Sequence, residues 1–111
     1  MTAGLIHWLL AFVATCAIEL VVVHHLGPAH PRRRHVALAA QAATHPFVWL
    51  AMALLPGSQL WTLAGVELWA TLVEAAIYRR YLGLRRGDAF ALSALANAAS
   101  LLIVASVALW L

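Results

Sequence analysis

Four long apolar segments alternate with short polar stretches along the chain. The segments cover residues 4–26, 36–55, 60–78 and 89–111, and each has the roughly 20 residues that a helix needs to cross a bilayer. The intervening stretches hold prolines, glycines or clustered arginines, which end helices. Because short connections favour antiparallel neighbours, the pattern predicts a single all-α domain over residues 1–111, a four-helix transmembrane bundle.

Composition agrees with a membrane protein and excludes an ordinary soluble domain. Hydrophobic residues make up 65% of the chain and charged residues 10%, against about 25% charged residues in soluble domains. All seven basic residues are arginines, in the connections 27–35 and 79–88. The positive-inside rule places both connections in the cytoplasm and both termini on the opposite side. Topology therefore explains the arginines without a nucleic-acid partner, although they could also hold anionic lipid headgroups. The lipid bilayer is the expected partner.

Residues near the segment ends refine this orientation. Asp88 precedes the fourth segment and is expected to be the N-cap of its helix. Aromatic belts predict that tryptophans mark the outer face and tyrosines the inner face. The residues concerned are Trp8, Trp61 and Trp110 outside, and Tyr78 and Tyr81 inside.

Polar residues inside the apolar segments are the candidate functional positions. Counted from the arginine-rich ends at 1.5 Å per residue, they fall in one layer about 6 to 17 Å deep. Within each segment they also share one helix face, as Glu67, Thr71 and Glu74 do. Lipid cannot satisfy such groups, so we expect them to face inward and bond to one another. The layer comprises Glu19, Gln41, Thr44, His45, Glu67, Thr71, Glu74, Asn97 and Ser100.

An internal repeat relates the first two segments to the last two. Residues 40–44 read Ala-Gln-Ala-Ala-Thr and residues 96–100 read Ala-Asn-Ala-Ala-Ser, while Glu19 matches Glu74. The match predicts two parallel two-helix repeats, related by a pseudo-two-fold axis along the membrane normal. The repeats would cover about residues 4–55 and 60–111.

Glu67 and His45 have no polar counterpart in this repeat. Phe12 takes the place equivalent to Glu67, and Leu101 takes the place equivalent to His45. Paired polar residues could form a common scaffold. A specialised activity is therefore expected at the unpaired ones.

Two chemistries suit the polar layer. Glu19, Glu67, Glu74 and His45 could coordinate a divalent metal ion such as zinc, manganese or iron, or relay protons, because hydrocarbon favours the neutral carboxyl. The remaining polar residues would then orient these four. Alternatively the layer holds helices together in a structural or accessory subunit. No nucleophile with oxyanion donors is recognisable, so no enzyme activity or catalytic residue is assigned.

A second histidine set lies at and after the end of the first segment. Histidine-rich tracts can bind metals, although the neighbouring arginines would repel a cation. This weaker candidate metal site consists of His24, His25, His30 and His35.

The polar pattern resembles a group of small uncharacterised bacterial four-span membrane proteins. It consists of Glu19, the run Thr44-His45-Pro46, the pair Glu67 and Glu74, and the run Asn97–Ser100. The resemblance implies a bacterial inner-membrane location and no known activity. Because a chain of 111 residues encloses little space, we expect it to work as a homo-oligomer or within a larger membrane complex.

Overall fold

Four helices account for nearly all of the described chain. The computed structural model describes residues 3–55 and 57–110, except for the side chains of residues 3, 59 and 104–110. The helices are α1 (Ala3–Leu26), α2 (Arg33–Leu54), α3 (Gln59–Leu82) and α4 (Arg86–Trp110). The described residues contain no strand, which confirms the all-α prediction.

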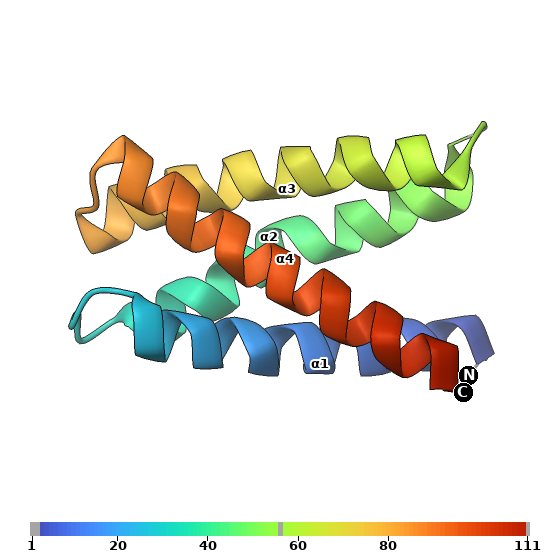
Figure 1. The fold of residues 1–111 in the computed structure, drawn as a ribbon, viewed down its shortest axis with the longest axis horizontal. Coiled ribbons are helices and arrows are strands. Elements are labelled where there is room, and N and C mark those ends of the chain that lie inside the picture. Colours follow the sequence, from blue (N-terminus) through green and yellow to red (C-terminus); the bar gives the residue numbers. More distant parts are fainter. Residues whose placement is uncertain (1–2, 56, 111) are drawn as a thin grey trace.

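The helices form a closed ring. Each helix packs against its neighbours in sequence, and α4 packs against α1 (Figure 1). The α1–α2 and α3–α4 connections lie at one end of the bundle, and the two marked chain ends lie at the other (Figure 1). The longest dimension of the bundle is 38 Å, comparable with a hydrocarbon layer of about 30 Å and its borders.

Three helices are long and apolar enough to cross a membrane. The spans are Gly4–Leu26, Arg33–Leu54 and Leu60–Leu82. Large apolar side chains cover the outside of the bundle, for example Leu10 at 64% exposed and Leu54 at 70%. An outer surface of this kind suits lipid rather than water. The chain therefore has the features of a membrane protein, and α4 as a fourth span stays a prediction.

The connections at the arginine-rich end are shorter than predicted. Gly83 ends α3 with a left-handed φ of +69°, a conformation that glycine adopts without steric cost. The helix α4 begins at Arg86, so Asp88 lies in its first turn. The prediction of Asp88 as the N-cap is therefore wrong. Its charge still favours this helix start, because carboxylates anywhere in the first turn complement the helix dipole.

Burial follows the internal repeat. Five buried residues of α2 recur as buried residues of α4, each 56 positions later. These pairs are Val36 with Leu92, Ala37 with Ser93, Ala40 with Ala96, Gln41 with Asn97, and Thr44 with Ser100. On α1 and α3 the buried pairs lie 55 positions apart: Thr15 with Ala70, Glu19 with Glu74, and Val23 with Tyr78. Equivalent helices thus turn equivalent faces inward.

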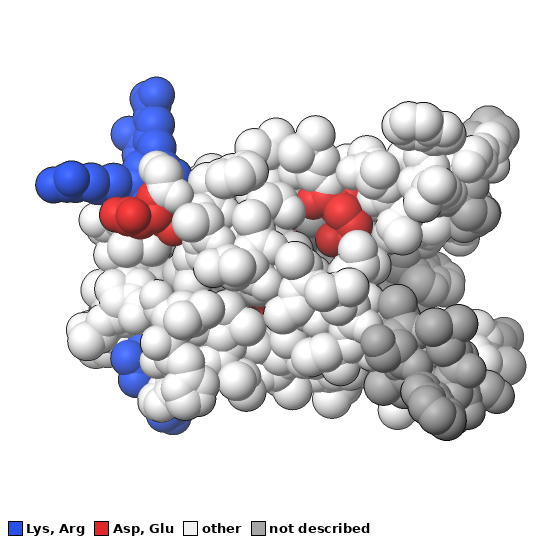
Figure 2. Space-filling model, viewed as in Figure 1, with Lys and Arg blue, Asp and Glu red and all other residues white. Residues whose placement is uncertain are grey.

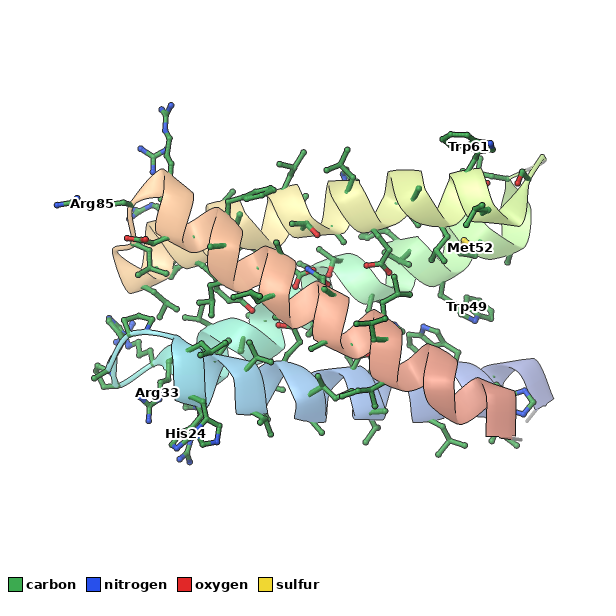
Figure 3. The ribbon with its side chains drawn as sticks, in the orientation of Figure 1. His24, Arg33, Trp49, Met52, Trp61 and Arg85 are labelled. Carbon is green, nitrogen blue, oxygen red and sulfur yellow. The ribbon has the colours of Figure 1, made fainter. Side chains whose placement is uncertain are left out.

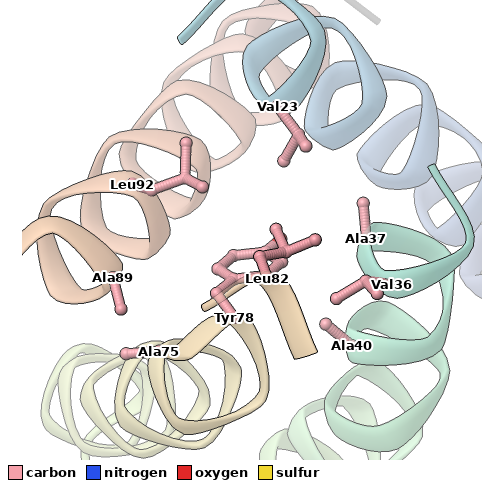
Figure 4. Packing of buried hydrophobic residues seen from close by; sticks show 9 residues of the cluster. All are labelled: Val23, Val36, Ala37, Ala40, Ala75, Tyr78, Leu82, Ala89 and Leu92. Carbon is pink, nitrogen blue, oxygen red and sulfur yellow. The ribbon is translucent and has the colours of Figure 1, made fainter. Parts of the chain in front are cut away.

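An apolar plug closes the arginine-rich half of the ring (Figure 4). All four helices contribute to it, and its small side chains let the helices approach closely. The plug consists of Val23, Val36, Ala37, Ala40, Ala75, Tyr78, Leu82, Ala89 and Leu92. The polar layer therefore begins where the plug ends and extends away from the arginine-rich end.

Candidate functional site

Glu74 on α3 is the most fully bonded member of the polar layer. Its Oε1 accepts a hydrogen bond of 2.7 Å from Nε2 of Gln41 on α2. Its Oε2 lies 3.2 Å from the Thr44 hydroxyl, which is also 3.0 Å from the carbonyl oxygen of Ala40. The Glu74 side chain is fully buried. Both donors lie on α2, so these bonds hold α2 to α3.

Glu19 on α1 is equally buried but less fully bonded. The Tyr78 hydroxyl of α3 donates to its Oε2 at 3.1 Å. This bond crosses the ring, because α1 and α3 are not neighbours in it. The carboxyl groups of Glu19 and Glu74 also interact with each other, while Oε1 of Glu19 has no hydrogen-bond donor among the described residues. The two matched glutamates therefore differ in their surroundings.

The helix α4 joins the layer through its own polar stripe. Ser93 donates its hydroxyl to the carbonyl oxygen of Thr71 at 2.7 Å. The side-chain amide of Asn97 donates to the carbonyl oxygen of Ser93 at 3.0 Å. Ser100 is buried, and its hydroxyl has no partner in the described structure. Thr71 thus contributes its backbone carbonyl to the contact with α4.

A cavity of about 110 Å³, lined by both polar and apolar side chains, lies within the layer. It could hold water, because a site needs only about 10–15 Å³ of such space per water and several polar partners. Side chains from all four helices line it, among them Thr15, Gln41, Thr44, His45, Glu67, Glu74, Asn97 and Ser100. The cavity thus brings together predicted site residues from separate helices. Glu19 lies beside Glu74, outside the lining itself.

His45 and Glu67 line the cavity without structural hydrogen bonds. The His45 ring packs against Phe12 and Trp8, with centroid distances of 5.1 and 6.0 Å, and its Nδ1 has no partner in the described chain. Glu67 is partly exposed. Acidic atoms reach the surface midway along the bundle, between α3 and α4 and far from the arginines (Figure 2). The cavity lining thus includes a partly exposed carboxyl group, that of Glu67.

The predicted metal sites find no support in the geometry. Within the described residues, no group of three or more His, Cys, Asp or Glu side chains is arranged to hold a metal ion. In the second histidine set, Nδ1 of His24 bonds the Arg33 guanidinium at 3.0 Å, and Nδ1 of His30 accepts from the backbone of Arg32 at 3.1 Å. These nitrogens stabilise the connection, while His25 packs edge-on against His24 and His35 is exposed.

The aromatic prediction stays a prediction for the tryptophans and is wrong for Tyr78. Trp49 and Trp61 lie at the end of the bundle opposite Arg33 and Arg85 (Figure 3). Tyr78 was expected at the inner interface, yet it is fully buried in the plug. Its burial could have been predicted from its position four residues after Glu74, which places both side chains on one helix face. The side chain of Trp110 lies outside the described residues.

We expect Tyr78→Phe to lower the free energy of unfolding by about 1 kcal/mol, because interhelical hydrogen bonds in membranes contribute about 0.6 and at most about 1.7 kcal/mol. Tyr81→Phe is the matched control, since Tyr81 is 61% exposed. Unfolding by sodium dodecyl sulfate, followed by circular dichroism, measures both. Equal stability of the two variants would contradict a structural role for the Tyr78–Glu19 bond.

The site therefore rests on the geometry of this chain alone: no family model, no curated protein and no solved structure matches it.

Proposed function

We propose that this protein is a small integral membrane protein that takes up and releases protons at the polar layer. The observation that carries this proposal is that, among the described residues, no hydrogen-bond partner is found for several buried polar atoms in or beside the cavity, including Oε1 of Glu19, the Ser100 hydroxyl and Nδ1 of His45. A layer that served only to hold helices together would satisfy its buried groups, because each unsatisfied group costs about 1–3 kcal/mol. Unmet hydrogen-bonding capacity is what a proton site with exchangeable water requires.

The internal repeat shows where this capacity arises. Thr44 bonds Glu74 on α3, and the equivalent pair in the other half is Ser100 with Glu19. In that half neither the Ser100 hydroxyl nor Oε1 of Glu19 has a hydrogen-bond partner within the described part of the chain. One carboxyl group is thus held by scaffold bonds, and its symmetric counterpart keeps a free oxygen.

The two carboxyl groups form a pair suited to sharing one proton. Glu19 and Glu74 are both fully buried and interact, and two adjacent carboxylates repel in a medium of low dielectric. A single proton between them removes the repulsion and supplies the donor that Oε1 of Glu19 lacks. We therefore place the inner proton site on this pair.

Glu67 and His45 are the residues through which protons would reach this pair. Both line the same cavity as Glu74, and neither makes a scaffold hydrogen bond within the described chain. Both are partly exposed. The apolar plug separates the pair from the arginine-rich end, so protons would enter from the opposite half. Passage across the whole membrane would require the plug to open.

The same proposal includes an orientation. The arginines gather at one end of the bundle (Figures 2 and 3), and basic connections remain in the cytoplasm. With α4 as the fourth span, both termini then lie outside, and the proton entry faces the outer half of a bacterial inner membrane.

Infrared difference spectroscopy between two pH values tests the proton site on purified protein. We expect a reversible protonated-carboxyl band from the wild type that is lost or shifted in Glu67→Gln. Asp88→Asn is the control, because Asp88 is exposed in the first turn of α4. If Glu67→Gln and wild type give the same carboxyl bands, Glu67 takes no part and the proposal fails.

A second candidate is an accessory subunit whose polar layer joins helices. The partial exposure of Glu67 on the side of the bundle favours it, because a polar group facing hydrocarbon is a candidate contact for another chain. Under this reading Glu67→Gln weakens an oligomer or complex instead of changing carboxyl bands. Size measurement of the wild type and variant in mild detergent separates the two.

A further inference from the structure

A groove between α2 and α3 opens at the arginine-rich end. Its volume is about 830 Å³. Two exposed arginines line it, Arg32 from the α1–α2 connection and Arg80 from the last turn of α3, and we call them its rim. Val36, Ala39 and Ile77 are among the apolar residues of its floor. We call this the basic groove.

The rim of the basic groove offers positive charge without a counterion. Neither Arg32 nor Arg80 pairs with a carboxylate among the described residues, and the groove lining contains no acidic side chain. The Arg80 guanidinium lies 5.7 Å from the centroid of the Tyr81 ring, a contact that restrains its direction. Two guanidinium groups are suited to a phosphate, which they bind through paired N–H donors.

The apolar floor of the groove extends along α2 beyond the two arginines of the rim. It follows one face of α2 from Val36 to Ala43, a descent of about 10 Å at 1.5 Å per residue. Ala39 and Ala43 are exposed along this path. A free phosphate ion would use only the rim, whereas a phospholipid would use the rim for its headgroup and the floor for an acyl chain.

The internal repeat supplies a second groove for comparison, between α1 and α4. It has a volume of about 360 Å³ and an apolar floor that includes Leu92 and Leu95. These two residues are the equivalents of Val36 and Ala39, 56 positions later. At the rim, Asp88 stands where the basic groove has Arg32, and Ala91 where it has His35. We call this the twin groove.

We propose that the basic groove is a specific binding site for one anionic phospholipid, and that the twin groove is not. The two grooves share their place in the repeat and their apolar floors, but the basic groove is the larger, about 830 Å³ against about 360 Å³, and has arginines at its rim. Arg32 and Arg80 hold the phosphate of the headgroup, and the floor along α2 receives an acyl chain. The site is independent of the proton site, because the apolar plug lies between the arginine-rich end and the cavity.

Native mass spectrometry of the detergent-purified protein tests this, with dioleoyl phosphatidylglycerol and dioleoyl phosphatidylcholine as probes. We expect the wild type to retain one phosphatidylglycerol and to prefer it to phosphatidylcholine. The double variant Arg32→Gln/Arg80→Gln should bind it about 30-fold more weakly, the effect of two basic residues at about 1 kcal/mol each. Millimolar inorganic phosphate should not displace the lipid; displacement would show a phosphate site instead and overturn the proposal.

Arg85→Gln/Arg86→Gln is the matched control. It removes the same charge from the same end, and neither residue lines the basic groove. If both double variants lose lipid equally, the end attracts anionic lipids by diffuse charge and the proposal is wrong. None of these arginines is buried, so the variants should fold.

The twin groove allows a gain of function. Asp88→Arg gives its rim the charge that Arg32 gives the basic groove, without an equivalent of Arg80, so we expect a second phosphatidylglycerol that binds more weakly than the first. A stoichiometry that stays at one would show that rim charge does not decide the difference between the grooves, contrary to the proposal.

Discussion

Replacing Glu74 by alanine should lower the free energy of unfolding by about 3 kcal/mol, the sum of lost interhelical bonds, an orphaned donor and a cavity. The side-chain amide of Gln41 loses its acceptor and is only 2% exposed, so bulk solvent does not replace the bond. Thr44 loses less, because it keeps the carbonyl oxygen of Ala40. Unfolding by sodium dodecyl sulfate, followed by circular dichroism, measures the change.

Glutamine at the same position should cost less than about 1 kcal/mol, because it conserves shape and bonding capacity. Its carbonyl can accept from Gln41, and its amide can donate to the free oxygen of Glu19, as a protonated Glu74 would. Glu67→Ala is the control for loss of a carboxyl group, since Glu67 makes no scaffold bond. If Glu74→Ala and Glu74→Gln are equally stable, the bonds to α2 do not hold the bundle together.

The position of the polar layer could be predicted because helix geometry determines it. Rise per residue gives depth, and a periodicity of 3.6 gives the shared face, so residues such as Gln41 and Asn97 could be assigned inward before any contact was known. Both are buried, at 2% and 9% exposed. The repeat could be predicted for the same reason, since equivalent faces carry equivalent side chains.

The differences between the halves could not be predicted in this way. A two-fold repeat predicts equal bonding of Glu19 and Glu74, yet Tyr78 donates to Glu19 and its equivalent, Val23, has no hydroxyl. Tyr78 was placed at the interface because tyrosine near a helix end usually lies there. Its contact with Glu19 depends on how closely α1 and α3 face each other across the ring, which periodicity does not supply.

The helix ends were also beyond sequence reasoning. The arginines suggested long polar loops, but Arg79 and Arg80 lie in the last turn of α3. Arginine favours helices and suits their C-terminal turns, where its charge complements the dipole. Because α3 continues through Arg80, this side chain lines the basic groove together with residues of α2. The arginines thus indicate topology in the sequence, whereas their place in a groove becomes visible only when the helices are packed.

Replacing the fully buried Ala40 or Ala96 by leucine should destabilise the bundle by about 3 kcal/mol each, because added carbons cannot fit between packed helices without strain. Both alanines are 0% exposed and occupy equivalent positions, on α2 and α4. The two-fold arrangement therefore predicts similar losses in the two halves, although Ala40 belongs to the plug and Ala96 lies next to Asn97.

Matched controls lie two residues further along each helix. Ala42 and Ala98 are exposed on the outer face, where leucine meets lipid, so Ala42→Leu and Ala98→Leu should change stability by less than about 0.5 kcal/mol. The same detergent unfolding measures all four variants. If the inner and outer substitutions cost the same, the faces are not packed as described. If Ala40→Leu lowers the free energy of unfolding and Ala96→Leu does not, α4 is packed less tightly in the ring than α2. The repeat would then be present in the sequence but not in the packing of the helices.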